Sequence, residues 1–170
     1  PKIIRIDTDP TTHGIFTQPD VAVTSRAEAA VPFLLELLET HNRARPSRAA
    51  ELQEAKDAWA KRSAVLEPQI TYLGIIRKEL GEDGIFVDEL TQVGFASRLV
   101  YPVYKPRTYI STGYQGTLGY GFPTALGVKV ARPEVPVISV TGDGGFMFGV
   151  QELATAVQHK IPLVTILFNN

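Results

Sequence analysis

The spacing of apolar residues divides the chain into strand-like and helix-like segments. Short apolar runs predict strands, and apolar residues three or four positions apart predict one face of a helix. Strands are predicted over residues 2–6, 21–23, 85–88, 108–110, 135–140 and 162–168. Helices are predicted from residue 24 or 25 to 39, within 47–62, over 68–80 and over 150–159. Strands that are apolar on both faces and alternate with helices are typical of a parallel sheet. We therefore predict an α/β fold whose parallel sheet has helices on both faces.

The character of the sequence changes twice along the chain. Residues 1–40 predict strand, loop, strand and helix, as at the closing end of an α/β domain. Residues 41–67 are rich in Ala, Glu, Lys and Arg, and we interpret them as an interdomain linker that contains a surface helix. Residues 68–170 hold the other predicted strands and helices and form a second α/β domain. Because the sequence starts within one strand and stops directly after another, we expect a piece of a longer protein.

Composition limits the classes of function. The chain of 170 residues is 44% apolar and 21% charged, and its net charge is −1. This charge does not indicate a nucleic-acid partner or an anionic membrane surface, since both favour basic proteins. The absence of cysteine excludes disulfides, thiolate nucleophiles and cysteine-bound zinc. The sequence shows neither a signal-peptide pattern nor an apolar run long enough to span a bilayer, so we expect a cytoplasmic protein.

The strongest chemical signal follows the strand predicted at 135–140. The sequence there is Gly142-Asp143-Gly144-Gly145. Glycines let the backbone approach a ligand closely, and a helix that follows points its free N–H groups and positive end back at this turn. Such a turn suits a phosphate. Asp143 would repel a phosphate, however, unless a divalent cation such as Mg²⁺ lies between them. The motif therefore predicts a metal-bridged diphosphate site.

A second polar pair, Asn169-Asn170, follows the strand predicted at 162–168. The 24 residues from 145 to 168 separate the two motifs and hold one helix and one strand. A right-handed crossover of this length leads to a neighbouring parallel strand, so both motifs would meet at the edge where α/β sheets bind ligands. The alternative is that Gly-Asp-Gly is an ordinary tight turn and Asn-Asn an ordinary loop. The two motifs together favour the binding site.

This spacing resembles the diphosphate-binding signature of thiamine-diphosphate-dependent enzymes. Further stretches are similar to acetolactate synthases and their relatives, namely residues 3–10, 113–123, 151–155 and 161–163. The resemblance covers essentially the whole chain and is least informative over residues 41–67. It implies an incomplete thiamine-diphosphate-binding fold for residues 68–170. Residues 1–40 are similar to the end of that family's Rossmann-like central domain.

The resemblance implies a role for each residue of the two motifs. Asp143 and Asn170 would hold Mg²⁺. Gly144 and Gly145, which follow Gly142, would donate backbone N–H groups to the diphosphate. The start of the next helix would add the positive end of its dipole.

Two upstream segments match other parts of the cofactor site. The Gly116 carbonyl would accept a hydrogen bond from the aminopyrimidine. Leu118 would lie under the cofactor and hold it in the V shape that brings this amino group to thiazolium C2; the alternative for Leu118 is a core residue. Val93-Gly94 matches a second turn that touches the diphosphate. The chain departs from the family at Phe95-Ala96, where acetolactate synthases usually have glutamine and histidine, and this puts the acetolactate reaction in doubt more than the cofactor.

The implied function is a thiamine-diphosphate- and Mg²⁺-dependent lyase or transferase that acts on small 2-oxo acids by decarboxylation, carboligation or both, as acetolactate synthases do. Benzoylformate-decarboxylase-like and benzaldehyde-lyase-like enzymes remain alternatives. So do a non-catalytic cofactor-binding or assembly subunit and a different magnesium-nucleotide-binding α/β protein. Some central domains of the family bind flavin, and residues 7–9 lie in the matching region, so FAD stays open.

The family's catalytic glutamate belongs to an N-terminal domain and reaches in from a partner subunit. Glu82, Glu89 and Glu152 match none of its motifs, so we assign this role to no residue here. We therefore expect this chain to be inactive by itself. Active sites shared between subunits imply a homodimer or homotetramer.

Overall fold

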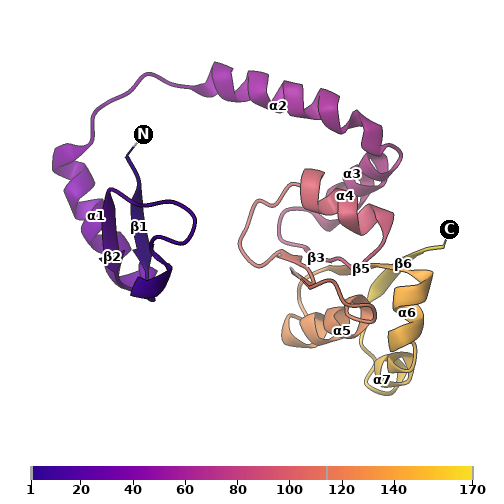
Figure 1. Cartoon of the computed structure of the whole chain (residues 1–170). Helices are drawn as coiled ribbons and strands as arrows, with labels where there is room; N and C mark the ends of the chain where they lie inside the picture. Colours follow the sequence, from indigo (N-terminus) through magenta and orange to yellow (C-terminus); the bar gives the residue numbers. More distant parts are fainter. Residues whose placement is uncertain (1, 114, 170) are drawn as a thin grey trace. The chain divides into compact units, whose positions relative to one another are not determined.

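The structure, a computed structural model, describes residues 2–113 and 115–169, and it divides the chain into two units, Pro1–Glu51 and Leu52–Asn170. The elements of the first unit are β1 (Ile4–Asp7), the 3-10 helix η1 (Pro10–Thr12), β2 (Val21–Thr24) and α1 (Ala27–His41). Strands β1 and β2 pair in parallel, from Ile4 opposite Val21 onward. This unit has the predicted strand, loop, strand and helix (Figure 1). The predicted boundaries at residues 40 and 67 stay predictions.

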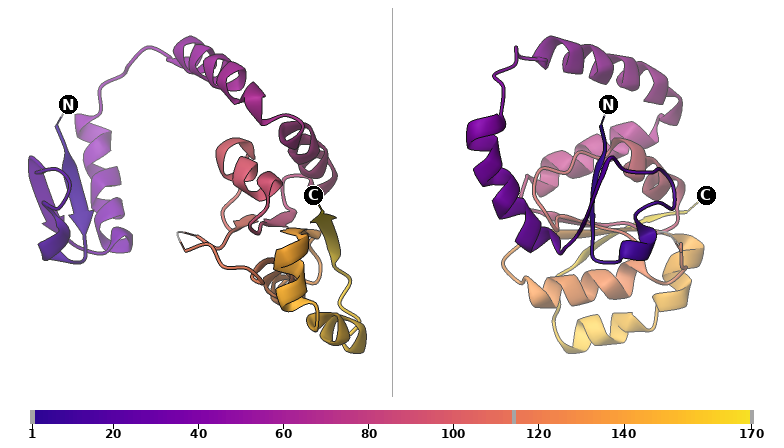
Figure 2. Two further views of the ribbon diagram at one scale, coloured as in Figure 1. Left: turned by 45° about the vertical axis from the view of Figure 1, so that its right-hand side comes forward. Right: turned by 60° about the vertical axis from the view of Figure 1, so that its left-hand side comes forward.

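The second unit contains a four-stranded parallel sheet. Its elements are α2 (Ala49–Ser63, which starts just before the division), η2 (Ala64–Leu66), α3 (Gln69–Leu80), β3 (Ile85–Val87), α4 (Gln92–Val100), β4 (Tyr109–Ile110), α5 (Gly121–Ala131), β5 (Val137–Gly142), α6 (Asp143–Gly149), α7 (Glu152–Gln158) and β6 (Val164–Phe168). The strand order is β4-β3-β5-β6, and every pair is parallel. Helices α3 and α4 cover one face of the sheet, and α5, α6 and α7 lie on the other (Figures 1 and 2). The predicted α/β fold is confirmed.

Each face of this sheet has its own apolar core. Phe86 of β3 points to the face under α3 and α4, where it stacks on Tyr101 with ring centroids 4.5 Å apart. Its neighbours Ile85 and Val87 point to the opposite face and pack against Ala125 of α5. Successive side chains of a strand alternate between faces, so a strand covered on both sides is apolar throughout. Burying each large apolar side chain contributes roughly 1.5–3 kcal/mol.

The sequence pattern did not predict helices α4 and α5. In α5 the buried residues Phe122, Ala125 and Leu126 follow helical spacing, but the helix starts in the glycine-dense segment 113–127, and glycine is a poor helix former. Helix α4 includes Val93-Gly94, which the resemblance assigned to a turn. The helix predicted over 150–159 is present as α7, and a separate short helix, α6, starts within the Gly-Asp-Gly motif itself. Over residues 2–113 and 115–169, no helix is both long and apolar enough to cross a bilayer.

Candidate functional site

The carboxyl ends of β3 and β5 form the topological switch point of the sheet. Strand β4 follows β3 in sequence and lies on one side of it, whereas β5 lies on the other side. The chain leaves β3 into α4 on one face and leaves β5 into α6 on the opposite face (Figure 1). Open α/β sheets bind ligands at such a point, beyond the carboxyl ends of the strands. The predicted diphosphate motif at the end of β5 therefore lies where the fold places ligands.

The ends of β5 and β6 lie side by side, as the crossover argument predicted. Gly142 is in register with Phe168, so Asn169 directly follows the residue opposite the motif. Asn170, the second predicted metal ligand, lies outside the described residues. Asp143 is exposed at the first position of α6. Gly144 is also exposed, and a Cβ added to it would meet no atom within 4 Å outside the backbone of its own helix and its chain neighbours in the described chain.

A segment from β3 lies between the two glycine-rich loops. A Cβ on Gly116 would come within 2.8 Å of Leu90 Cδ2, and a Cβ on Gly142 within 3.4 Å of the Leu90 carbonyl oxygen and 3.6 Å of Thr91 Cβ. Gly116 and Gly142 therefore approach the same short segment, residues 90–91. Leu118 is 45% exposed. This exposure does not fit the alternative of a core residue, and the contact of Leu118 with the cofactor stays a prediction.

Val93-Gly94 lies in a helix and not in the predicted turn, and its predicted contact with the diphosphate stays a prediction. Both residues are buried within the first turn of α4, which begins after Thr91, and Val93 packs in the core. Glycine is needed at position 94 because a Cβ there would collide with the backbone carbonyl of Glu89. Helix packing thus explains this glycine. Leu90 and Thr91, which the sequence reasoning missed, form the loop beside Gly142 instead.

Glu89 is a second feature that the sequence reasoning missed. Its side chain is fully buried, and its carboxylate accepts hydrogen bonds from the backbone N–H groups of Gly119, Tyr120 and Gly121 and from Thr141 Oγ1. One carboxylate thereby joins β3 to β5 and to the start of α5. A negative charge at the N-terminus of a helix is favourable because it meets the positive end of the helix dipole.

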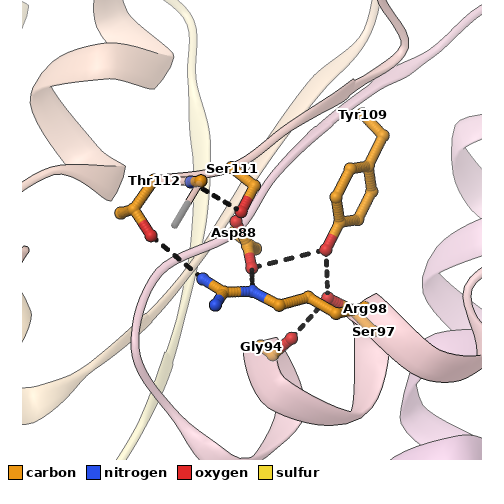
Figure 3. A network of polar contacts seen from close by, with 8 residues as sticks. Asp88, Gly94, Ser97, Arg98, Tyr109, Ser111 and Thr112 are labelled. Atoms are coloured by element: carbon orange, nitrogen blue, oxygen red, sulfur yellow. Dashed lines mark hydrogen bonds and ion pairs between the residues drawn. The ribbon is translucent and has the colours of Figure 1, made fainter. Parts of the chain in front are cut away.

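Asp88 carries a second buried carboxylate directly before Glu89, and Figure 3 shows its surroundings. Its Oδ2 accepts hydrogen bonds from Arg98 Nε at 3.0 Å and from Tyr109 Oη at 3.4 Å. Arg98 also donates to Thr112 Oγ1 at 3.0 Å. Burial raises the pKa of Asp88, and the hydrogen bond from Arg98 opposes that shift. The network ties α4 to the segment that follows β4.

These two carboxylates had one signal in the sequence. Asp88-Glu89 comes directly after the apolar run 85–87, and the carboxyl end of a buried parallel strand is where α/β sheets place functional residues. Their partners could not be found in this way. Glu89 contacts residues 30 to 52 positions further along the chain.

The geometry defines an α/β protein with a candidate ligand site at the carboxyl ends of its parallel strands, and comparison with known proteins shows the family. Residues 90–170 match the family described as "Thiamine pyrophosphate enzyme, C-terminal TPP binding domain"; thiamine pyrophosphate is another name for thiamine diphosphate. The chain thus carries a domain of this family, and the resemblance drawn from the Gly-Asp-Gly motif is confirmed.

Several curated relatives match nearly the whole chain. It is similar to the acetolactate synthase large subunit of Haemophilus influenzae, with 36% identity over 99% of the chain. It is 32% identical to both the acetolactate synthase isozyme 3 large subunit of Escherichia coli K12 and the glyoxylate carboligase of Escherichia coli O157:H7, again over 99% of the chain. The chain spans only 30–31% of the length of these relatives.

Proposed function

We propose that the full-length protein is a thiamine-diphosphate- and Mg²⁺-dependent enzyme that joins or decarboxylates small 2-oxo acids, as an acetolactate-synthase-like transferase or lyase. The observation that carries the proposal is the pairing of β5 with β6, with Gly142-Asp143-Gly144 following one strand and Asn169-Asn170 following the other. The relatives support it by their names, which include acetolactate synthase and glyoxylate carboligase.

The residues at this edge fit a metal-bound diphosphate. Asp143 is exposed and offers a hard carboxylate oxygen, and Asn170 would add a neutral amide oxygen, both suited to Mg²⁺. The first turn of α6 has no side-chain cap among the described residues, so the N–H groups of Gly144 and Gly145 remain for an anion. The metal ion would offset the repulsion between Asp143 and the diphosphate.

The segment before α5 would hold the organic part of the cofactor. The Gly116 carbonyl would accept the aminopyrimidine N–H, and the exposed Leu118 side chain would support the bend between the two rings. When bound, thiamine diphosphate supplies a nucleophilic carbon and an electron sink for the carbanion.

The remaining elements of the proposal lie outside this chain. The catalytic glutamate would come from another domain, in a homodimer or homotetramer with shared active sites, and this chain alone would be inactive. A flavin contact at residues 7–9 stays a prediction. Benzoylformate-decarboxylase-like and benzaldehyde-lyase-like activities remain the alternatives for the reaction, and a non-catalytic assembly subunit remains the alternative to an enzyme.

Replacing Asp143 with alanine in the full-length protein tests the proposed metal site. We expect the Mg²⁺-dependent affinity for thiamine diphosphate to fall by at least roughly 100-fold, since even groups that only orient metal ligands are worth about 10- to 100-fold. Isothermal titration calorimetry with and without Mg²⁺ measures the change. Asp57→Ala is the matched control, because Asp57 is exposed on α2 and bonds only to Gln53 among the described residues.

Unchanged affinity in the Asp143 variant would contradict the proposed site. Turnover of pyruvate against benzoylformate by the unmodified full-length protein then separates the reaction classes. Cofactor binding without turnover of any 2-oxo acid would favour the non-catalytic assembly subunit.

A further inference from the structure

Glu89 accepts hydrogen bonds on both carboxylate oxygens, from three backbone N–H groups and from the Thr141 hydroxyl. Oε1 accepts the N–H groups of Gly119 and Tyr120, the latter at 3.2 Å. Oε2 accepts the N–H of Gly121 at 3.1 Å and the hydroxyl of Thr141 at 2.6 Å. Each of these protein groups needs an acceptor in a buried place. A carboxylate accepts from all four groups at once, whereas an amide would turn its NH₂ group toward at least one backbone N–H, which cannot accept.

The segment that carries Gly116 and Leu118 depends strongly on this carboxylate. In the described part of the chain, the one hydrogen bond that joins residues 115–119 to another element is the bond from Gly119 N–H to Glu89. Gly119 also has a φ of +81°, a conformation that side chains disfavour. Glu89 thus fixes the point at which this segment turns into α5.

The diphosphate turn, by contrast, has support of its own. Strand β5 pairs with β3 over Val137–Ser139 and with β6 over Ile138–Gly142, so backbone hydrogen bonds hold it from both sides. Glu89 bonds to β5 only through the Thr141 hydroxyl. The carboxylate also packs against Gly145, where a Cβ would lie 2.5 Å from Oε1, but no hydrogen bond joins these two residues in the described part of the chain. Loss of the hydrogen bonds of Glu89 would therefore loosen residues 115–121 more than residues 142–145.

We propose that Glu89 is a positioning residue that sets the Gly116–Leu118 segment at a fixed place relative to the diphosphate turn. This inference rests on the proposed cofactor site, since it assigns the two segments to the two ends of one ligand. Glu89 touches no part of that ligand and acts through the backbone of residues 119–121. Its effect falls on the ring-bearing part of the cofactor and spares the diphosphate.

The test compares two ligands in Glu89→Gln and unmodified full-length protein. Thiamine diphosphate needs both segments, whereas inorganic pyrophosphate with Mg²⁺ needs only the turn at 142–145. We expect E89Q to lower the affinity for thiamine diphosphate by roughly 10- to 100-fold, which corresponds to the loss of one hydrogen bond to a charged group. Pyrophosphate affinity should change by no more than about threefold, within the spread of such effects. Glu82→Gln, an exposed glutamate seven positions away, is the matched control.

Amide hydrogen exchange on the cofactor-free protein gives an independent measurement. The amides of residues 119–121 should exchange faster in E89Q, while those of β5 keep their protection. Thr141→Val removes one partner of Glu89 without freeing residues 119–121, so it should leave both the exchange at 119–121 and the ratio of the two affinities unchanged.

Several outcomes would overturn the proposal. If a folded E89Q loses affinity equally for both ligands, Glu89 has only a general structural role. If amide exchange at residues 119–121 is unchanged, Glu89 does not hold the segment. If E89Q does not fold, Glu89→Asp replaces it, because aspartate keeps the charge but has a shorter side chain. The proposal then requires Glu89→Asp to lose affinity for thiamine diphosphate and to keep its affinity for pyrophosphate. If the unmodified protein binds no thiamine diphosphate, the proposed function fails, while the exchange measurement still decides whether Glu89 holds residues 119–121.

Discussion

Replacing Arg98 with methionine would leave Asp88 as a buried carboxylate without a charged partner (Figure 3). The Asp88 side chain is fully buried, and its Oδ1 has no hydrogen-bond partner within the described residues. Removing one partner of a buried ion pair costs roughly 3–5 kcal/mol. We expect the unfolding free energy to fall by about 3 kcal/mol, the lower end of this range. The Arg98 side chain is 29% exposed, and Tyr109 still bonds to Asp88 in the variant.

The cost should depend on pH in a defined direction. Burial raises the pKa of Asp88, and Arg98 opposes the shift, so the variant raises this pKa further. A carboxyl group whose folded pKa exceeds its unfolded value contributes stability at low pH and loses it as the pH rises through the folded pKa. The deficit of the variant is therefore largest at about pH 7.5 and shrinks toward about pH 5, as Asp88 becomes protonated.

Urea unfolding at both pH values, followed by circular dichroism, measures these differences in free energy. Arg62→Met is the control. Arg62 lies 5.8 Å from the centroid of the Trp59 ring, much as Arg98 lies 5.7 Å from that of Phe95. The Arg62 side chain, however, is exposed and forms no ion pair among the described residues. Adding Asp88→Asn to the Arg98 variant should recover part of the lost stability. A deficit that is equal at both pH values, and that Asp88→Asn does not relieve, would refute the reasoning.

Two further substitutions test the packing near the site. Gly145→Ala places a Cβ 2.5 Å from Glu89 Oε1 and should lower the unfolding free energy by about 1–3 kcal/mol. Gly144→Ala meets open space and should change it by no more than about 0.5 kcal/mol. Equal urea midpoints for the two variants would refute this contrast. Tyr101→Phe removes a buried hydroxyl without a partner among the described residues, so neutral-pH stability should stay the same or rise by about 1 kcal/mol. Burial raises the pKa of Tyr101 from 10.0 to about 12, and the fall in stability between these pH values should be smaller in the variant, which a pH series of urea curves measures.

The periodic segments could be predicted because their apolar residues face a core. The predictions for α1, α3 and each of the six strands agree with the structure to within a few residues. Helix α4 was missed because Val93-Gly94 was assigned to a turn, and α5 because it begins among glycines. At position 94 the structure shows a packing reason for glycine, the close approach of the Glu89 carbonyl, and the predicted contact with the cofactor stays a prediction.

The sequence by itself determined the α/β class, the pairing of the Gly-Asp-Gly motif with the strand before Asn169, and the thiamine-diphosphate family. The first two follow from local signals, namely apolar periodicity, turn residues and the length of one crossover, and the family follows from the resemblance of the motifs to its signature. Only the tertiary structure showed that residues 90–91 lie between Gly116 and Gly142, and that Glu89 binds residues 119–121 and Thr141. Such contacts join residues up to 52 positions apart, and no local pattern encodes them, because they depend on which strands become neighbours and on which face each helix packs.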